Sequence, residues 1–194
     1  MNRRALLLLP LLAGCGLSER PYAERRQWPL AVTRPAALPA RAGGRILELR
    51  TLRAGPTLEA RGLQTMQPDG SMKTGFYEEW AVPPAQGAEE ALRRWLADSG
   101  LFAGITAPGS RATPDLSLEG ELVALNANPA TRTATASLAI TIVTGKSDPA
   151  RILLQRNFTE TAAMQGEGPQ AEVQSTLAAL TIVLARIEAA LRSI

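Results

Sequence analysis

The chain has 194 residues, of which 45% are hydrophobic but only 4% aromatic, which suits one domain packed mainly by Ala and Leu. It contains no His, which excludes Ser-His-Asp and Cys-His triads and removes the commonest zinc ligand. The formal net charge is +3, and the single Cys excludes an intramolecular disulfide.

Residues 1–14 have the layout of a secretory leader. A basic start, Asn2-Arg3-Arg4, precedes an apolar run from Ala5 to Leu12 that is shorter than the roughly 20 residues needed to span a bilayer. The stretch Leu12-Ala13-Gly14-Cys15 resembles the lipobox of bacterial lipoproteins, in which the Cys thiol is alkylated with diacylglycerol, the leader is cut before it, and the new amine is acylated. We therefore expect a lipidated Cys15 at the start of the mature chain. An ordinary cleaved leader, with Cys15 as an incidental small residue, is the alternative.

Removal of the leader makes the chain nearly neutral. Loss of Arg3 and Arg4 lowers the 21 basic residues to 19, against 18 acidic ones, so a nucleic-acid partner is not expected. Stable anchoring takes about two acyl chains, with roughly 0.8 kcal/mol for each buried CH₂, and a lipoprotein carries two or three chains. Residues 15–27 are then the lipidated N-terminus and a polar tether, and residues 28–194 form a single domain.

The first half of the domain is predicted to be mostly extended. Leu30 to Val32 is a short strand candidate between two prolines, and Ile46 to Leu52 is another. Leu58 to Met66 and Met72 to Val82 flank Pro68-Asp69-Gly70, which predicts a hairpin because Pro presets φ and Gly accepts a positive φ. Alternation in the second arm places Met72, Phe76, Trp80 and Val82 on one face, and Tyr77 and Glu79 on the other.

An amphipathic helix is predicted from Ala88 to Ser99. Its apolar stripe consists of Ala88, Ala91, Leu92, Trp95 and Leu96. Glu89 and Glu90 each stand four residues before an Arg, which is the favourable order for helix ion pairs. Gly100 is placed to end this helix, and Leu101 to Thr106 is a short strand or connector.

The second half contains three alternating strands and a long helix. The strands run from Leu116 to Ala124, from Ala134 to Ile142 and from Ile152 to Thr161, and their short turns predict an antiparallel meander. The helix from Gln170 to Ile194 has a core stripe of Val173, Leu177, Leu180, Leu184, Ile187, Leu191 and Ile194. We expect an α+β two-layer sandwich, in which a largely antiparallel, mixed β-sheet has two helices packed on one face.

The last helix also has a second apolar face, composed of Ala178, Ile182, Ala185 and Ala189. Small residues there permit close approach of another surface. The high helix propensity of Ala explains the same pattern without any partner.

Residue types that could carry catalysis occur in unfavourable contexts. Ser71 and Lys73 form a possible Ser/Lys pair, but they follow a turn where both are ordinary solvent residues. Glu119 and Glu121 share a strand face, but their alternation with Leu indicates a solvated face. Gly166-Glu167-Gly168 lacks the rest of any phosphate-binding motif. We therefore expect no catalytic residue, no cofactor and no metal site.

Several stretches resemble one family of bacterial lipoproteins. They are Gly44-Arg45-Ile46, the run from Tyr77 to Pro84 that contains Trp80 before Pro83-Pro84, Leu96 to Phe102, Asp115 to Leu122, and the closing Ala/Leu helix. With the lipobox, these stretches resemble the auxiliary lipoproteins of ABC-type transport systems, the PqiC-like family of membrane integrity-associated transporter subunits. The resemblance covers residues 28–194.

The resemblance implies a non-enzymatic lipoprotein of the outer membrane that faces the periplasm. Its relatives work beside MCE-domain proteins, which form tubes or rings that carry lipids between the two Gram-negative membranes. It therefore implies an MCE-domain partner and an auxiliary role in lipid transport, with a homo-oligomeric ring as a further possibility. Gly16, rather than Asp, after Cys15 favours sorting to the outer membrane. The alternative function is an outer-membrane assembly lipoprotein that chaperones a β-barrel or lipopolysaccharide machinery.

Overall fold

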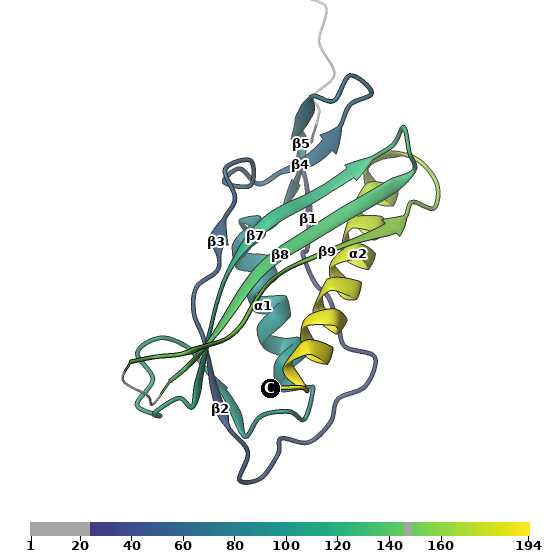
Figure 1. The fold of residues 1–194 in the computed structure, drawn as a ribbon. Coiled ribbons are helices and arrows are strands. Elements are labelled where there is room, and N and C mark those ends of the chain that lie inside the picture. Colours follow the sequence, from purple (N-terminus) through teal and green to yellow (C-terminus); the bar gives the residue numbers. More distant parts are fainter. Residues whose placement is uncertain (1–23, 146–148) are drawn as a thin grey trace, which may run out of the picture.

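The sheet is centred on three long antiparallel strands. The computed structural model describes residues 24–145 and 149–194 (Figure 1). Strands β7 (Leu116–Asn128), β8 (Thr133–Thr144) and β9 (Ile152–Ala163) form the predicted meander. Their buried side chains on the helix side include Leu116, Leu118, Leu122, Ala136, Leu138, Ile140, Ile142 and Phe158. The register of β7 shifts between Leu122 and Ala124, so Leu125 and Ala127 continue the buried face instead of the predicted Ala124.

Short parallel strands make the sheet mixed, as expected. β2 (Ile46–Leu49), β3 (Arg53–Ala54) and β4 (Gly62–Met66) pair with successive parts of β7, all in parallel. β6 (Gly104–Thr106) extends the sheet beyond β2. The predicted strand from Ile46 to Leu52 therefore ends at Leu49, and the chain bends before pairing again as β3.

The predicted hairpin consists of β4 and β5 (Met72–Trp80). Gly70 takes a φ of 84° in its turn. The Asp69 carboxylate accepts hydrogen bonds from the backbone N–H of Ser71 at 2.9 Å and from its hydroxyl at 2.7 Å. The Pro-Asp-Gly sequence therefore forms the turn that its chemistry predicts.

The predicted alternation along β5 is wrong, because a wide bulge interrupts the hairpin. Gly62 pairs with Glu79, while Gln64 pairs with Thr74, so Leu63 alone faces the four residues from Gly75 to Glu78. The extra residues shift the phase of the strand. Phe76 is 65% exposed and Trp80 only 1%, although the alternation placed them on one face, whereas Glu79 is buried.

The N-terminal strand lies earlier than predicted. β1 (Arg26–Trp28) pairs in parallel with the end of β5, whereas the predicted strand from Leu30 to Val32 is not part of the sheet. After Pro29 the chain leaves the sheet and runs along the helices as an irregular segment, residues 29–41, which we call the strap. Leu30 packs so closely on the first helix that a Cβ at Gly87 would lie 2.9 Å from the Cβ of Leu30.

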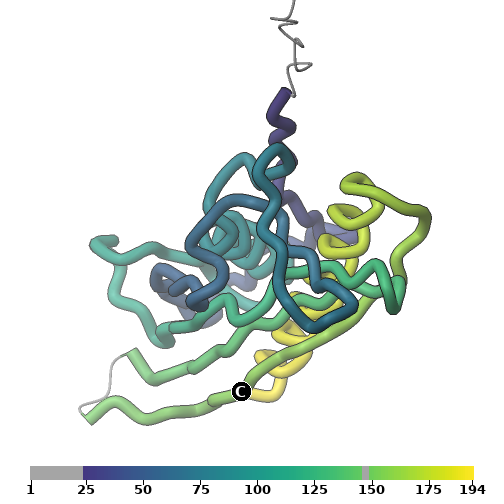
Figure 2. Tube along the Cα trace, turned by 90° about the horizontal axis from the view of Figure 1, so that it is seen from above, coloured from purple at the N-terminus to yellow at the C-terminus, as the bar shows by residue number. Residues whose placement is uncertain are grey.

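Two helices cover one face of the sheet, as predicted (Figures 1 and 2). Helix α1 (Pro84–Ala97) begins a turn earlier than Ala88, because Pro suits the first helical position, where its missing N–H is not needed. The predicted Glu89–Arg93 and Glu90–Arg94 ion pairs form. Gly100 follows the helix with a φ of 67°.

Helix α2 (Gly168–Leu191) crosses β7, β8 and β9. Its length and apolar composition would allow it to span a membrane, but half of its most apolar window is buried within the fold. The predicted stripe provides this buried face: Val173, Leu180, Leu184, Ile187 and Leu191 are buried, and Leu177 and Ile194 are partly buried. We therefore assign α2 as a core helix.

Candidate functional site

The two pairs singled out for catalysis lie in separate parts of the fold, Ser71 and Lys73 at the hairpin and Glu119 and Glu121 on β7. The Ser71 hydroxyl is engaged by Asp69 at the hairpin tip. Glu119 and Glu121 pair with Arg50 and Arg53 at 3.2 and 3.3 Å on the sheet face away from the helices. Cys15, the predicted lipidation site, lies outside the described residues. Among residues 24–145 and 149–194, no group of three acidic, His or Cys side chains is placed to hold a metal ion.

A broad hollow lies on the polar face of the sheet. It has a volume of about 610 Å³ and is lined by Arg50, Glu119, Thr141, Gln155, Asn157 and their neighbours. Its two carboxylates are each paired with an Arg, Glu119 with Arg50 between β2 and β3, and Glu121 with Arg53 in β3. The hollow is therefore an exposed surface on which the acidic side chains are paired with Arg.

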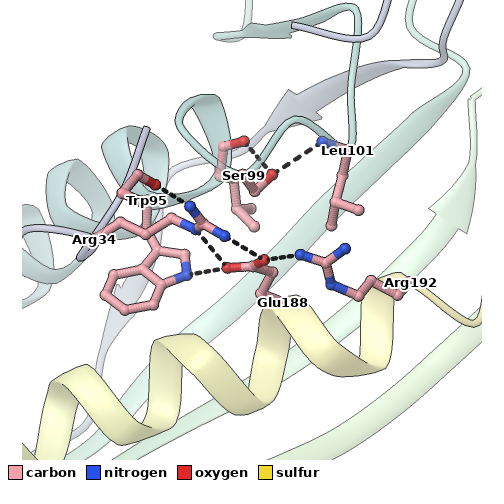
Figure 3. A network of polar contacts seen from close by, with 8 residues as sticks. Arg34, Trp95, Ser99, Leu101, Glu188 and Arg192 are labelled. Carbon is pink, nitrogen blue, oxygen red and sulfur yellow. Dashed lines mark hydrogen bonds and ion pairs between the residues drawn. The ribbon is translucent and has the colours of Figure 1, made fainter. Parts of the chain in front are cut away.

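A buried polar cluster joins the strap to both helices (Figure 3). Glu188 of α2 is only 6% exposed, and its carboxylate accepts a hydrogen bond from Trp95 Nε1 at 2.7 Å. Arg34 of the strap reaches the same carboxylate through Nε at 3.0 Å and Nη2 at 3.2 Å. Arg192, one turn further along the chain, donates to it as well. We call these four residues the Glu188 cluster.

The Glu188 cluster keeps a buried carboxylate ionised. Burial raises the pKa of Glu188, whereas hydrogen bonds from Arg34, Arg192 and Trp95 lower it. The lowering outweighs the effect of burial, so the pKa of Glu188 lies below its ordinary value. The same pairing raises the pKa of Arg34. An ionised carboxylate with several charge-assisted donors holds the strap in one position on the helices.

Further contacts hold the strap beyond Arg34. The backbone N–H of Leu38 donates to the Asp98 carbonyl at 2.9 Å, and that of Arg41 donates to the Phe102 carbonyl at 3.0 Å. The strap is thus fixed to the end of α1 and the segment that follows it. Sequence reasoning did not single out the Glu188 cluster. The available signal was an acidic residue beside the core stripe of α2, with Arg192 four residues later.

The second apolar face of α2 lies on the outside of the described structure. Ala178, Ile182, Ala185 and Ala189 are all exposed, and Ile182 is 38% exposed. Each position lies about opposite the buried stripe on the helix circumference. This face is therefore available to another surface.

Most of the chain matches a known protein family. Residues 29–188 match the family described as ABC-type transport auxiliary lipoprotein component. The chain belongs to this family. The match begins at the strap and ends at Glu188, so it includes α1, most of α2 and all strands after β1. The protein is accordingly an auxiliary component of an ABC-type transport system and has partners within that system.

Solved structures share the fold of this auxiliary lipoprotein. The protein XCC0632 from Xanthomonas campestris is 20% identical, with a TM-score of 0.70 over 84% of this chain and 92% of that one. The hypothetical protein CT253 from Chlamydia trachomatis is 8% identical, with a TM-score of 0.53 over 78% of this chain and 99% of that one. Comparison with curated protein sequences gives no match. At these identities the likeness concerns the fold alone.

Proposed function

We propose that this protein is a non-enzymatic, lipid-anchored auxiliary subunit of an MCE/ABC-type lipid transport system that maintains membrane integrity. The observation that carries the proposal is the family match over residues 29–188. The lipobox-like stretch ending at Cys15 adds an anchor, and Gly16 favours the outer membrane with the domain in the periplasm. The protein acts by assembly with an MCE-domain partner.

Two structural observations support assembly rather than turnover. The two carboxylates in the hollow on the polar sheet face, Glu119 and Glu121, are each occupied by an Arg partner. The outer face of α2 presents small apolar residues, with Ile182 at its centre. A symmetric ring reuses one such patch on every subunit, and this face suits either self-association or contact with the transport partner.

The test is crosslinking in intact envelopes combined with light scattering of the purified protein. Wild type is expected to crosslink to an MCE-domain protein, and Ile182→Arg to lose that crosslink or the self-association. Gln155→Arg is the matched control, since it adds the same charge on the exposed sheet face. Thermal melting of both variants checks that the fold is intact.

The outcomes separate the candidate functions. A strictly monomeric wild type that crosslinks to no transport component would overturn the assembly role. Crosslinks to a β-barrel or to lipopolysaccharide machinery instead would support the alternative of an outer-membrane assembly chaperone.

A further inference from the structure

The bulge in the β4–β5 hairpin presents two neighbouring aromatic side chains to solvent. Phe76 is 65% exposed and Tyr77 is 48% exposed, and Phe76 is the most exposed large apolar side chain in the described residues. The other aromatic residues from Trp80 onward, namely Trp80, Trp95, Phe102 and Phe158, are buried. Exposed adjacent aromatics are thus unusual within this fold.

Two glycines, Gly62 and Gly75, allow the close backbone contacts that form the bulge. A Cβ at Gly62 would lie 2.1 Å from the Gly75 carbonyl oxygen, and a Cβ at Gly75 would lie 2.6 Å from the Glu78 carbonyl oxygen. Glycine at both positions therefore allows the backbone to close beneath the extra residues of the bulge. The two rings meet edge to face with centroids 5.0 Å apart, so they form one projecting unit.

The described chain begins beside this aromatic pair. The Arg25 guanidinium lies 4.5 Å from the centre of the Phe76 ring, and Arg26 pairs with Glu78 across the β1–β5 ladder. Figures 1 and 2 show the start of the described chain next to the hairpin. Nine residues, 15–23, separate the predicted lipid on Cys15 from this point. Fully extended, they span at most about 30 Å.

We propose that Phe76 and Tyr77 rest on the lipid surface that holds the anchor, so that the hairpin orients the domain on its membrane. Aromatic side chains with an apolar body concentrate at the membrane–water interface, and nearby cations attract lipid phosphates. Arg25 and the exposed Lys73 supply such cations on the same hairpin region. This inference rests on the lipid anchor of the proposed function.

The test uses the full-length lipidated protein in phosphatidylcholine vesicles with or without brominated acyl chains. Bromine quenches indole emission only at short range, so Phe76→Trp reports contact of the bulge with lipid. Ile152→Trp is the matched control, since Ile152 is 62% exposed at the β9 end remote from the hairpin. Wild-type emission, subtracted from both, accounts for the three native Trp residues.

The indole introduced at position 76 is expected to lose much more of its emission in brominated vesicles than the one at position 152. Equal quenching at both positions, or none at position 76, overturns the proposal. Intact-mass analysis and vesicle flotation of the same samples distinguish a failure of the hairpin contact from a failure of the lipid anchor. A chain that is lipidated and floats but shows no quenching at position 76 overturns only the hairpin contact, whereas a chain without lipid that does not float overturns the anchor as well.

Discussion

Glu188 shows how one side chain can connect three segments. Its carboxylate binds Trp95 of α1, Arg34 of the strap and Arg192 at the end of α2. A buried carboxylate is costly without partners, and here each partner comes from a different part of the chain. The residue therefore specifies how the strap and helices are positioned relative to one another.

Glu188→Gln should lower the free energy of unfolding by about 1–3 kcal/mol, because the charge-assisted donors lose an ionised acceptor. Glu90→Gln is the control, because its ion pair with Arg94 is exposed and should contribute no more than about 0.5 kcal/mol. Denaturant unfolding of both variants measures the difference. Equal effects would show that the Glu188 cluster does not stabilise the fold.

The same carboxylate predicts a pH dependence. The folded-state pKa of Glu188 lies below its ordinary value of 4.5, so its contribution to stability is present above that value and is lost as the pH falls through the folded-state pKa. The stability difference between wild type and Glu188→Gln should therefore be constant near neutral pH and shrink below about pH 4.5. Thermal melting across this range is the measurement, and a difference that grows in acid would contradict the assigned direction.

Among the elements, α2 has two faces with opposite roles. Leu184 is fully buried, while the next residue, Ala185, is exposed. Leu184→Asp should destabilise the protein by several kcal/mol because it buries an unpaired charge, whereas Ala185→Asp should change stability little. A thermal melt of each variant tests the pair. Similar melting temperatures would mean that the stripe is not core.

The strap and α1 pack at a glycine. Ala normally stabilises a helix relative to Gly, but a Cβ at Gly87 would meet Leu30 at 2.9 Å. Gly87→Ala should therefore destabilise the protein by about 1 kcal/mol. Gly104→Ala is the control, since a Cβ there meets nothing within 4 Å. If Gly87→Ala stabilised the protein, Leu30 would have moved aside with little loss of packing, which would contradict the prediction.

Local patterns predicted the elements better than their mutual positions. The meander, the Pro-Asp-Gly hairpin and the core stripe of α2 follow from short-range periodicity and turn chemistry, and all three are confirmed. The bulge opposite Leu63 was not predicted. The alternating pattern of β5 continues through residues 75–78, which have no paired residues on β4. The parallel pairing of β1 with β5 joins residues about fifty positions apart, which no local pattern reveals.

For the molecule as a whole, the sequence predicted the family and the outer face of α2, while the predicted lipid anchor at Cys15 lies outside the described residues. The family resemblance is confirmed over residues 29–188. The Glu188 cluster could not be predicted, because it depends on Arg34 and Glu188 meeting across 154 positions of sequence. The exposure of Phe76 and Tyr77 likewise depends on the bulge rather than on their hydropathy.

Cys15→Ala should leave the fold intact but release the protein from its membrane. The core side chains described all lie beyond the tether, so folding does not depend on the thiol. Fractionation and intact-mass analysis should find wild type in the membrane with acyl mass added and the variant without it. Wild type that carries no lipid would contradict the anchor, and a variant that unfolds would contradict the independence of the domain.

The parallel pairing of β1 with β5 has a mechanical consequence under the proposed lipid anchor. Under the proposed anchor, force from the membrane would enter the described fold at the N-terminal end of β1, and a pull along the β1 axis would load its pairing with β5. The β1–β5 hydrogen bonds then carry the load together in shear, instead of opening one after another as in a peeled hairpin. After β1 separates, the next contacts to bear the force would be those of the strap at Arg34, Leu38 and Arg41. Tension from the membrane would therefore reach the helices before the centre of the sheet.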